Sequence, residues 1–139
     1  MKQFFDELSI HTKGRGLYDI TSIIVSWVDK QEIQDGLLTM FIQHTSASLL
    51  INENYDSDVQ RDLESFFSRL VKDGDNLFTH TIEGDDDMPA HIRTALTQTN
   101  LSIPIKNRKM LLGQWQGVYI FEHRYSEFHR KVRIHLIGD

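Results

Sequence analysis

Histidine is the residue type in this chain whose number and placement most directly suggest chemistry. The 139 residues include seven histidines and no cysteine, so thiolate zinc sites, disulfides and cysteine nucleophiles are excluded. His80 and His91 flank an acidic segment, and His44 follows an apolar run. Three imidazoles that leave one position open form a known ligand set for catalytic zinc. We therefore treat these three histidines as candidate ligands of a divalent metal, although their spacing fits no short metal-binding motif.

The acidic segment between two of these histidines contains Glu83 and three successive aspartates, residues 85–87. Adjacent carboxylates repel one another, and a nearby cation relieves that repulsion. A solvated acidic loop is the alternative interpretation. With a metal bound, Glu83 or Asp87 would lie behind an imidazole ligand and fix its tautomer through a hydrogen bond.

A second polar segment, residues 43–48, directly follows an apolar run that is typical of a buried strand. Hydroxyl groups and backbone donors at the end of a strand can converge on an anion or a substrate oxygen. Ser46, Ser48 and Asn52 are therefore candidates for neutral hydrogen bonds to a substrate. A polar turn with a hydrogen-bonded histidine is the alternative.

Charged residues near the end of another predicted strand complete the set of candidates. Glu122 and Arg124 lie on one face of that strand, where they would pair with each other or bind a substrate together. Arg124 is the candidate ligand for a phosphate or carboxylate group. Glu122 is a candidate general acid or base. Asp62 is a second candidate. The helix dipole favours carboxylates only in the first helical turn, and Asp62 lies beyond that turn, so the dipole does not account for it.

The elements that must position these residues are helices and strands in an irregular order. A period of 3.6 residues predicts three helices, one ending near Lys30, one over about 55–71, and one starting at Pro89. The nearly continuous apolar run 37–42 predicts a strand covered on both faces. Because there is no regular βαβ rhythm, we expect an α+β fold with a mainly antiparallel, curled or two-layered sheet. The length fits a single domain over residues 1–139.

Charge and hydropathy exclude two classes of partner. The chain has 15 Lys and Arg against 20 Asp and Glu, a net charge of −5, so it lacks the basic field that drives nucleic-acid binding. No stretch approaches the roughly 18 apolar residues of a membrane span, and the amino terminus does not have the pattern of a signal peptide. We therefore expect a cytoplasmic protein with neither a nucleic acid nor a membrane as its partner.

Several multi-residue blocks occur along the chain in a fixed order and spacing. They are His44–Ser48, Asn52–Asn54, Asp58–Glu64, His80 with Glu83-Gly84, Asp86–Ile92, Leu112-Gly113, Trp115–Gly117 and Glu122–Arg124. In this order and spacing the blocks resemble the secondary thiamine-phosphate synthase family, also called YjbQ. The resemblance covers nearly the whole chain. It departs from the family pattern at Tyr55, Ser57, Asp85 and Gln114, none of which is a candidate ligand.

The resemblance implies a compact α+β domain that associates as a homotrimer, with a polar pocket lined by the histidines. It also implies a low-efficiency thiamine-phosphate synthase that joins an aminopyrimidine diphosphate to a thiazole phosphate. The expected cofactor is a divalent metal, zinc or magnesium, and the expected substrate is a phosphorylated small molecule. Two other functions remain open. One is a metal-assisted hydrolase, because neutral imidazoles suit water activation, and the other is a non-catalytic module that binds a small anion or metabolite.

Overall fold

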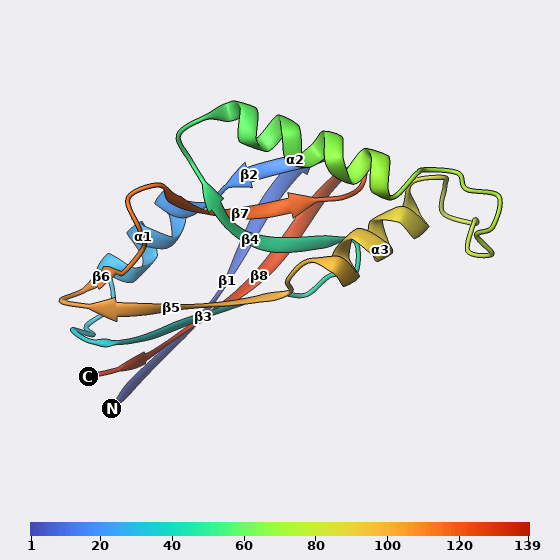
Figure 1. The fold of residues 1–139 in the computed structure, drawn as a ribbon. Helices are drawn as coiled ribbons and strands as arrows, with labels where there is room; N and C mark the ends of the chain where they lie inside the picture. The colour runs from blue at the N-terminus through green and yellow to red at the C-terminus, as the bar shows by residue number, and fades with distance from the viewer.

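The computed structural model describes all residues, 1–139, and contains two antiparallel sheets and three helices (Figure 1). The chain therefore has the predicted α+β fold with a curled, two-layered antiparallel sheet. The larger sheet has the order β1 (Lys2–Lys13), β8 (Glu127–Gly138), β3 (Gly36–Ile42), β5 (Asn100–Lys106) and β6 (Lys109–Met110). The smaller sheet has the order β2 (Gly16–Asp19), β7 (Gln116–Glu122) and β4 (Ala47–Glu53).

The two longest strands, β1 and β8, form a long ribbon that extends from the chain termini to a position behind the smaller sheet (Figure 1). They pair along their whole length, from Lys2 with Gly138 to Lys13 with Glu127, so the chain termini lie side by side. At the other end of the ribbon, side chains of Thr12 and Arg130 contact Glu122 at the end of β7. The ribbon thus brings the larger sheet to the end of β7, at the candidate acid–base residue Glu122.

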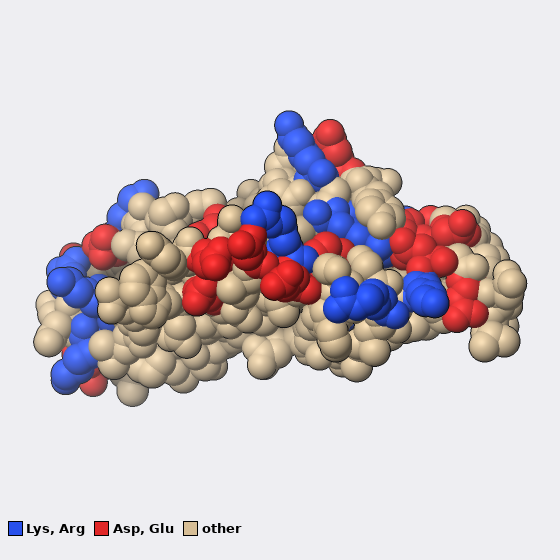
Figure 2. All heavy atoms as spheres, turned by 45° about the horizontal axis from the view of Figure 1, so that its top comes forward, with Lys and Arg blue, Asp and Glu red and all other residues tan.

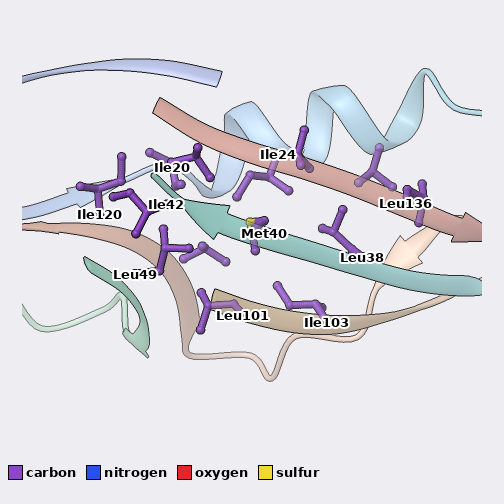
Figure 3. Close-up of a cluster of buried hydrophobic side chains, with 14 of the residues drawn as sticks. Ile20, Ile24, Leu38, Met40, Ile42, Leu49, Leu101, Ile103, Ile120 and Leu136 are labelled. Atoms are coloured by element: carbon purple, nitrogen blue, oxygen red, sulfur yellow. The ribbon is translucent and has the colours of Figure 1, made fainter. Parts of the chain in front are cut away.

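The hydrophobic core lies between the two sheets and is closed on one side by α1 (Thr21–Asp29) (Figure 3). Alternate residues of β3, such as Leu38 and Met40, are fully buried, whereas Leu37 and Phe41 are 41% and 49% exposed. The prediction that this strand is covered on both faces was wrong. The sheet is antiparallel and packs on the core with one face only, which leaves the other face in contact with solvent.

The other two helices flank the smaller sheet and carry three of the candidate residues, Asp62, Asp87 and His91. α2 (Ser57–Leu70) lies along the outside of that sheet (Figure 1) and begins at Asp56, whose carboxylate accepts a hydrogen bond from the backbone N–H of Asp58. α3 (Asp87–Leu96) begins two residues before Pro89. Proline fits within a first turn because the amides there have no intrahelical partner. None of the three helices is both long and apolar enough to cross a membrane.

Ion pairs fix the connection between α2 and α3, residues 71–86, to the rest of the molecule. Asp73 accepts two hydrogen bonds from the guanidinium of Arg15, at 2.6 and 2.8 Å. Asp86 accepts a hydrogen bond from Arg124 at 3.0 Å. Figure 2 shows acidic side chains gathered at this end of the molecule, with basic groups beside them. The connection is therefore held in place although it contains no regular secondary structure.

Candidate metal centre

Two histidines and one aspartate come together at the start of α3. One nitrogen each of His80 and His91 and one oxygen of Asp87 lie within 4.8 Å of one another. His80 comes from the connection before α3, whereas Asp87 and His91 lie one turn apart on the helix. The Asp87 side chain is only 2% exposed, and both rings remain accessible. Two imidazoles and a carboxylate are a donor set suited to zinc and to other borderline divalent cations.

The carboxylate of Asp87 is the centre of this cluster. Its Oδ2 atom lies 2.6 Å from Nε2 of His80 and 3.2 Å from Nε2 of His91. Its other oxygen, Oδ1, accepts a hydrogen bond from Nη1 of Arg124 at 2.7 Å. Burial alone would raise the pKa of Asp87, but the hydrogen bond with His80 and the nearby positive charge of Arg124 lower it below its ordinary value. Asp87 is therefore ionised at neutral pH, as a metal ligand must be.

The hydrogen bonds of His91 determine which of its ring nitrogens directs a lone pair towards the cluster. Nδ1 lies 2.9 Å from the carbonyl oxygen of Thr45, which can only accept a hydrogen bond, so Nδ1 carries the proton. In the neutral ring, Nε2 then directs a lone pair towards the carboxylate of Asp87. A lone pair and a carboxylate repel unless a proton or a cation lies between them. The site is thus arranged for a positive charge at this point.

A small surface hollow of about 240 Å³ lies next to the cluster and gives access to His80. It is lined mainly by polar and acidic groups, and no lysine or arginine contributes to its wall. A bound molecule would therefore meet the accessible imidazole beside an electronegative surface. The lining residues are Gly74, Asp75, Asn76, Phe78, His80, Thr81, Gly84 and Asp85.

The structure does not bring His44, the third predicted ligand, to this cluster. Its Nε2 accepts a hydrogen bond from the backbone N–H of Lys131 at 2.8 Å, and its Nδ1 lies 3.5 Å from Arg130. Burial, followed by the positive charge of Arg130, lowers the pKa of His44. The polar segment 43–48 instead contributes to the site through the backbone carbonyl of Thr45, which sets the tautomer of His91.

The two residues predicted to support an imidazole have different positions. Asp87 belongs to the ligand cluster itself, whereas Glu83 does not. The backbone carbonyl of Glu83 accepts a hydrogen bond from Arg124 at 2.9 Å. Arg124 is also held by Asp86 and Asp87. Because all three of its nitrogens have protein partners, Arg124 orients carboxylates in this structure and does not face the hollow as a free phosphate ligand.

The two predicted acid–base residues also lie outside the cluster. Glu122 is fully buried and accepts hydrogen bonds from Thr12 and, through both oxygens, from Arg130. Such a saturated carboxylate has no free lone pair directed at a substrate, so its place is structural. Asp62 is exposed on α2 and is not part of the ligand cluster.

The predicted neutral hydrogen-bonding residues are used inside the protein. Ser46 accepts from Arg130 at 3.0 Å, and Ser48 is paired with His123 at 2.9 Å. Asn52 accepts from the backbone N–H of the next residue. None of the three belongs to the ligand cluster.

One signal in the sequence did point to the clustered side chains. Asp87 and His91 are four residues apart, and side chains at that spacing lie on the same face of a helix. The predicted start at Pro89 left Asp87 outside the helix, so this relationship was missed. Because the helix begins at Asp87, His91 lies beyond the first turn, where the helix dipole has little effect on an imidazole.

Comparisons with known proteins agree with this fold over almost the full chain. The family model described as "UPF0047 protein YjbQ-like" matches residues 6–139. A UPF0047 protein from Synechocystis is 46% identical over 99% of this chain and 94% of its own length. The UPF0047 protein YjbQ from Escherichia coli O157:H7 is 39% identical over 95% of this chain and 96% of its own length.

Solved structures show the same architecture. A protein of the YjbQ/UPF0047 family from Clostridium acetobutylicum is 32% identical, covers 96% of this chain and 99% of its own, and superposes with a TM-score of 0.83. A YbjQ-like protein from Sulfolobus solfataricus, described as being of unknown function, reaches a TM-score of 0.89 at 21% identity, with 99% of both chains covered. At that identity the likeness concerns the fold alone. Family model, relatives and fold together establish that this chain belongs to the YjbQ/UPF0047 family.

Proposed function

We propose that the chain is a metal-dependent enzyme in which His80, Asp87 and His91 hold one divalent cation. The observation that carries the proposal is the convergence of these three ligand atoms within 4.8 Å around a buried carboxylate. The protonated Nδ1 of His91 adds support, because it leaves a lone pair on Nε2 facing that carboxylate. A cation at this point would satisfy both groups.

The donor set favours zinc, or a similar borderline metal, over magnesium. Magnesium prefers oxygen ligands and usually keeps several waters, whereas imidazole suits zinc, iron and other transition metals. Here two of the three donors are imidazole nitrogens. Two of the proposed ligands also form hydrogen bonds with neighbouring groups: Asp87 accepts one from Arg124, and His91 donates one to the carbonyl of Thr45. Partners of this kind orient metal ligands and tune their basicity.

Metal-assisted hydrolysis is the reaction class that this arrangement supports best. With His80, Asp87 and His91 as its protein ligands, a divalent cation would supply Lewis acidity to a water or to a carbonyl or phosphoryl oxygen. The chain's own residues hold the ligands, and the hollow beside His80 receives the substrate. Because that hollow is acidic and lacks lysine and arginine, it suits a neutral or cationic substrate better than a polyphosphate.

The thiamine-phosphate synthase activity implied by the resemblance is the second candidate. All the sequence blocks that carry the resemblance are present. Displacement of pyrophosphate, however, needs positive charge around the leaving group. The nearest guanidinium, that of Arg124, is engaged by Asp86, Asp87 and the carbonyl of Glu83. The site therefore supports a transferase activity less well than it supports metal-assisted hydrolysis.

The homotrimer implied by the resemblance also belongs to the proposal. The outer face of the five-stranded sheet offers a contact surface, because Phe5, Leu37 and Phe41 are 72%, 41% and 49% exposed there. Analytical ultracentrifugation of the wild type should give the mass of three chains. Phe5→Glu combined with Phe41→Glu should give a smaller species if this face forms the contact, and an unchanged mass would exclude it.

Metal analysis followed by a substrate screen tests the proposed function. Purified protein should contain about one zinc-type ion per chain, and loading with zinc or manganese should support hydrolysis of a phosphoester or amide substrate. Turnover of the thiamine precursors alone, in the presence of magnesium, would instead favour the transferase. A small molecule captured from the cell, with no turnover of any substrate, would favour the non-catalytic binding module.

A further inference from the structure

Every buried side-chain nitrogen or oxygen that lacks a hydrogen-bond partner lies near the junction of α2, α3 and the end of β7. These atoms are Nε and Nη2 of Arg93, Oε2 of Glu64, Oγ1 of Thr94 and Nδ1 of His123. Buried polar groups are nearly always satisfied in native proteins, and leaving one without a partner costs about 1–3 kcal/mol. Four of these five atoms can donate a hydrogen bond that a bound oxyanion would accept, whereas Oε2 of Glu64 can only accept one.

The guanidinium of Arg93 is the principal unsatisfied group. Its side chain is fully buried, and only Nη1 has a partner, the carboxylate of Glu64 at 2.8 Å. The two free nitrogens, Nε and Nη2, share one edge of the planar group. An edge of this kind donates two parallel hydrogen bonds to a carboxylate or phosphate. Arg93 therefore presents a complete oxyanion-binding edge without an acceptor.

His123, which contributes another of the unsatisfied atoms, is subject to nearby positive charge. Burial, followed by the charges of Arg93, Arg15 and Arg130, lowers the pKa of His123 to about 3. The ring of His123 is therefore neutral, and its Nε2 lies 2.9 Å from Oγ of Ser48. When Ser48 donates this hydrogen bond, the ring proton lies on Nδ1 and adds a further donor. An anion would gain from both the charge and the donors.

We propose that Arg93 and His123 form a binding site for a small oxyanion, the phosphate or carboxylate group of a metabolite, separate from the metal centre. Glu64 controls access to this site. Its side chain is 28% exposed, so the site lies close to solvent at this residue. Because its carboxylate competes for the guanidinium of Arg93 and repels anions, the oxyanion binds as Glu64 turns towards solvent.

Titration with inorganic phosphate tests this site on the whole, chelator-treated protein, in which phosphate cannot bind through a cation. Isothermal calorimetry gives the Kd, and the Nε–Hε signal of Arg93 in a nitrogen–proton NMR spectrum reports the place of binding. Glu64→Gln removes the competing negative charge and should tighten phosphate binding on the order of tenfold. Arg93→Gln should abolish binding. Arg108→Gln, which removes an exposed and unrelated cation, should leave the Kd unchanged.

Three results would overturn the proposal. The first is an Arg93 signal that does not move with phosphate in either the wild type or Glu64→Gln, which would assign the unpaired atoms to ordered water. The second is a Kd that Glu64→Gln leaves unchanged, and this variant decides the question even where Arg93→Gln does not fold. The third is loss of binding in Arg108→Gln, which would show that phosphate binds at the surface.

Discussion

Nδ1 of His91 lies 2.9 Å from the carbonyl oxygen of Thr45, a residue 46 positions earlier in the chain. This contact joins the first turns of α3 to the segment between β3 and β4. It fixes the tautomer of His91, so Nε2 faces Asp87 with a lone pair. The contact therefore explains how a segment that contributes no side chain to the cluster still sets which nitrogen of His91 faces Asp87.

Removal of His91 should remove the metal, whereas removal of His44 should not. His91→Ala eliminates one of the three converging ligands, and we expect the metal content of purified protein to fall from about one ion per chain to near zero. His44→Ala is the matched control, because its ring contacts Lys131 and Arg130 instead of the cluster. Elemental analysis of both variants measures the difference. A metal content that depends on His44 and not on His91 would contradict the proposed ligand set.

Local patterns predicted the fold well because they report on nearby residues. The apolar period predicted a helix over about 55–71, and α2 occupies Ser57–Leu70 with Asp56 as its cap. The strand over 37–42 was placed correctly, but its burial was not, since apolar residues also occupy its outer face. Leu37 and Phe41 show that a continuous apolar run does not by itself reveal whether a second layer covers it.

The site was harder to predict because it depends on contacts between distant segments. The sequence named His80 and His91 as candidates, and the structure brings them together, but the sequence cannot show that His44 faces β8 instead of α3. The role of Glu122 was also hidden, because its partner Arg130 belongs to the next strand and both are buried only in the folded chain. Residue types thus located the polar segments that gather near the site. The contacts formed in the folded chain determine which of their side chains are already paired with other protein groups.

Arg124→Gln should weaken metal binding without removing a ligand. Arg124 donates to Oδ1 of Asp87, and loss of such a supporting partner typically lowers metal affinity 10- to 100-fold. It should also lower the free energy of unfolding by about 3–5 kcal/mol, because two largely buried carboxylates lose their counter-charge. Competition with a chelating dye measures the affinity, and urea unfolding measures the stability.

Arg133→Gln is the matched control for that experiment. Arg133 pairs with Glu7 on the surface of the large sheet, and exposed pairs contribute about 0–1 kcal/mol. We expect neither its metal affinity nor its stability to change appreciably. If Arg124→Gln behaved like this control, Arg124 would not be a positioning residue for Asp87.

His123 should make the protein less stable as the pH falls below about 6.5. Burial, followed by three nearby guanidinium charges, lowers its pKa to about 3 in the folded state, whereas an unfolded chain takes up the proton near pH 6.5. The unfolded state thus binds more protons between these values, and the stability lost is about 1.4 kcal/mol per pH unit in that window. Urea unfolding between pH 7.5 and 5 measures the slope.

Two variants separate the contribution of His123 from that of other groups. His123→Gln should reduce the slope between pH 6.5 and 5 by about 1.4 kcal/mol per unit, whatever its stability at pH 7.5. His129→Gln replaces an exposed histidine and should retain the slope of the wild type. An identical pH dependence in the wild type and His123→Gln would show that His123 takes up its proton equally in both states.

Glu122→Gln distinguishes a structural role from the predicted acid–base role. Glu122 is fully buried and forms hydrogen bonds through both oxygens with Arg130, whose side chain is only 3% exposed. Removing one charge leaves the other buried without a partner, which costs about 3–5 kcal/mol. Combining it with Arg130→Met should recover part of this loss, because the unpaired cation is gone. Metal content should be normal in the folded double variant. A general acid or base would behave differently, since its loss lowers turnover by about 10²- to 10⁴-fold while the free energy of unfolding stays close to that of the wild type.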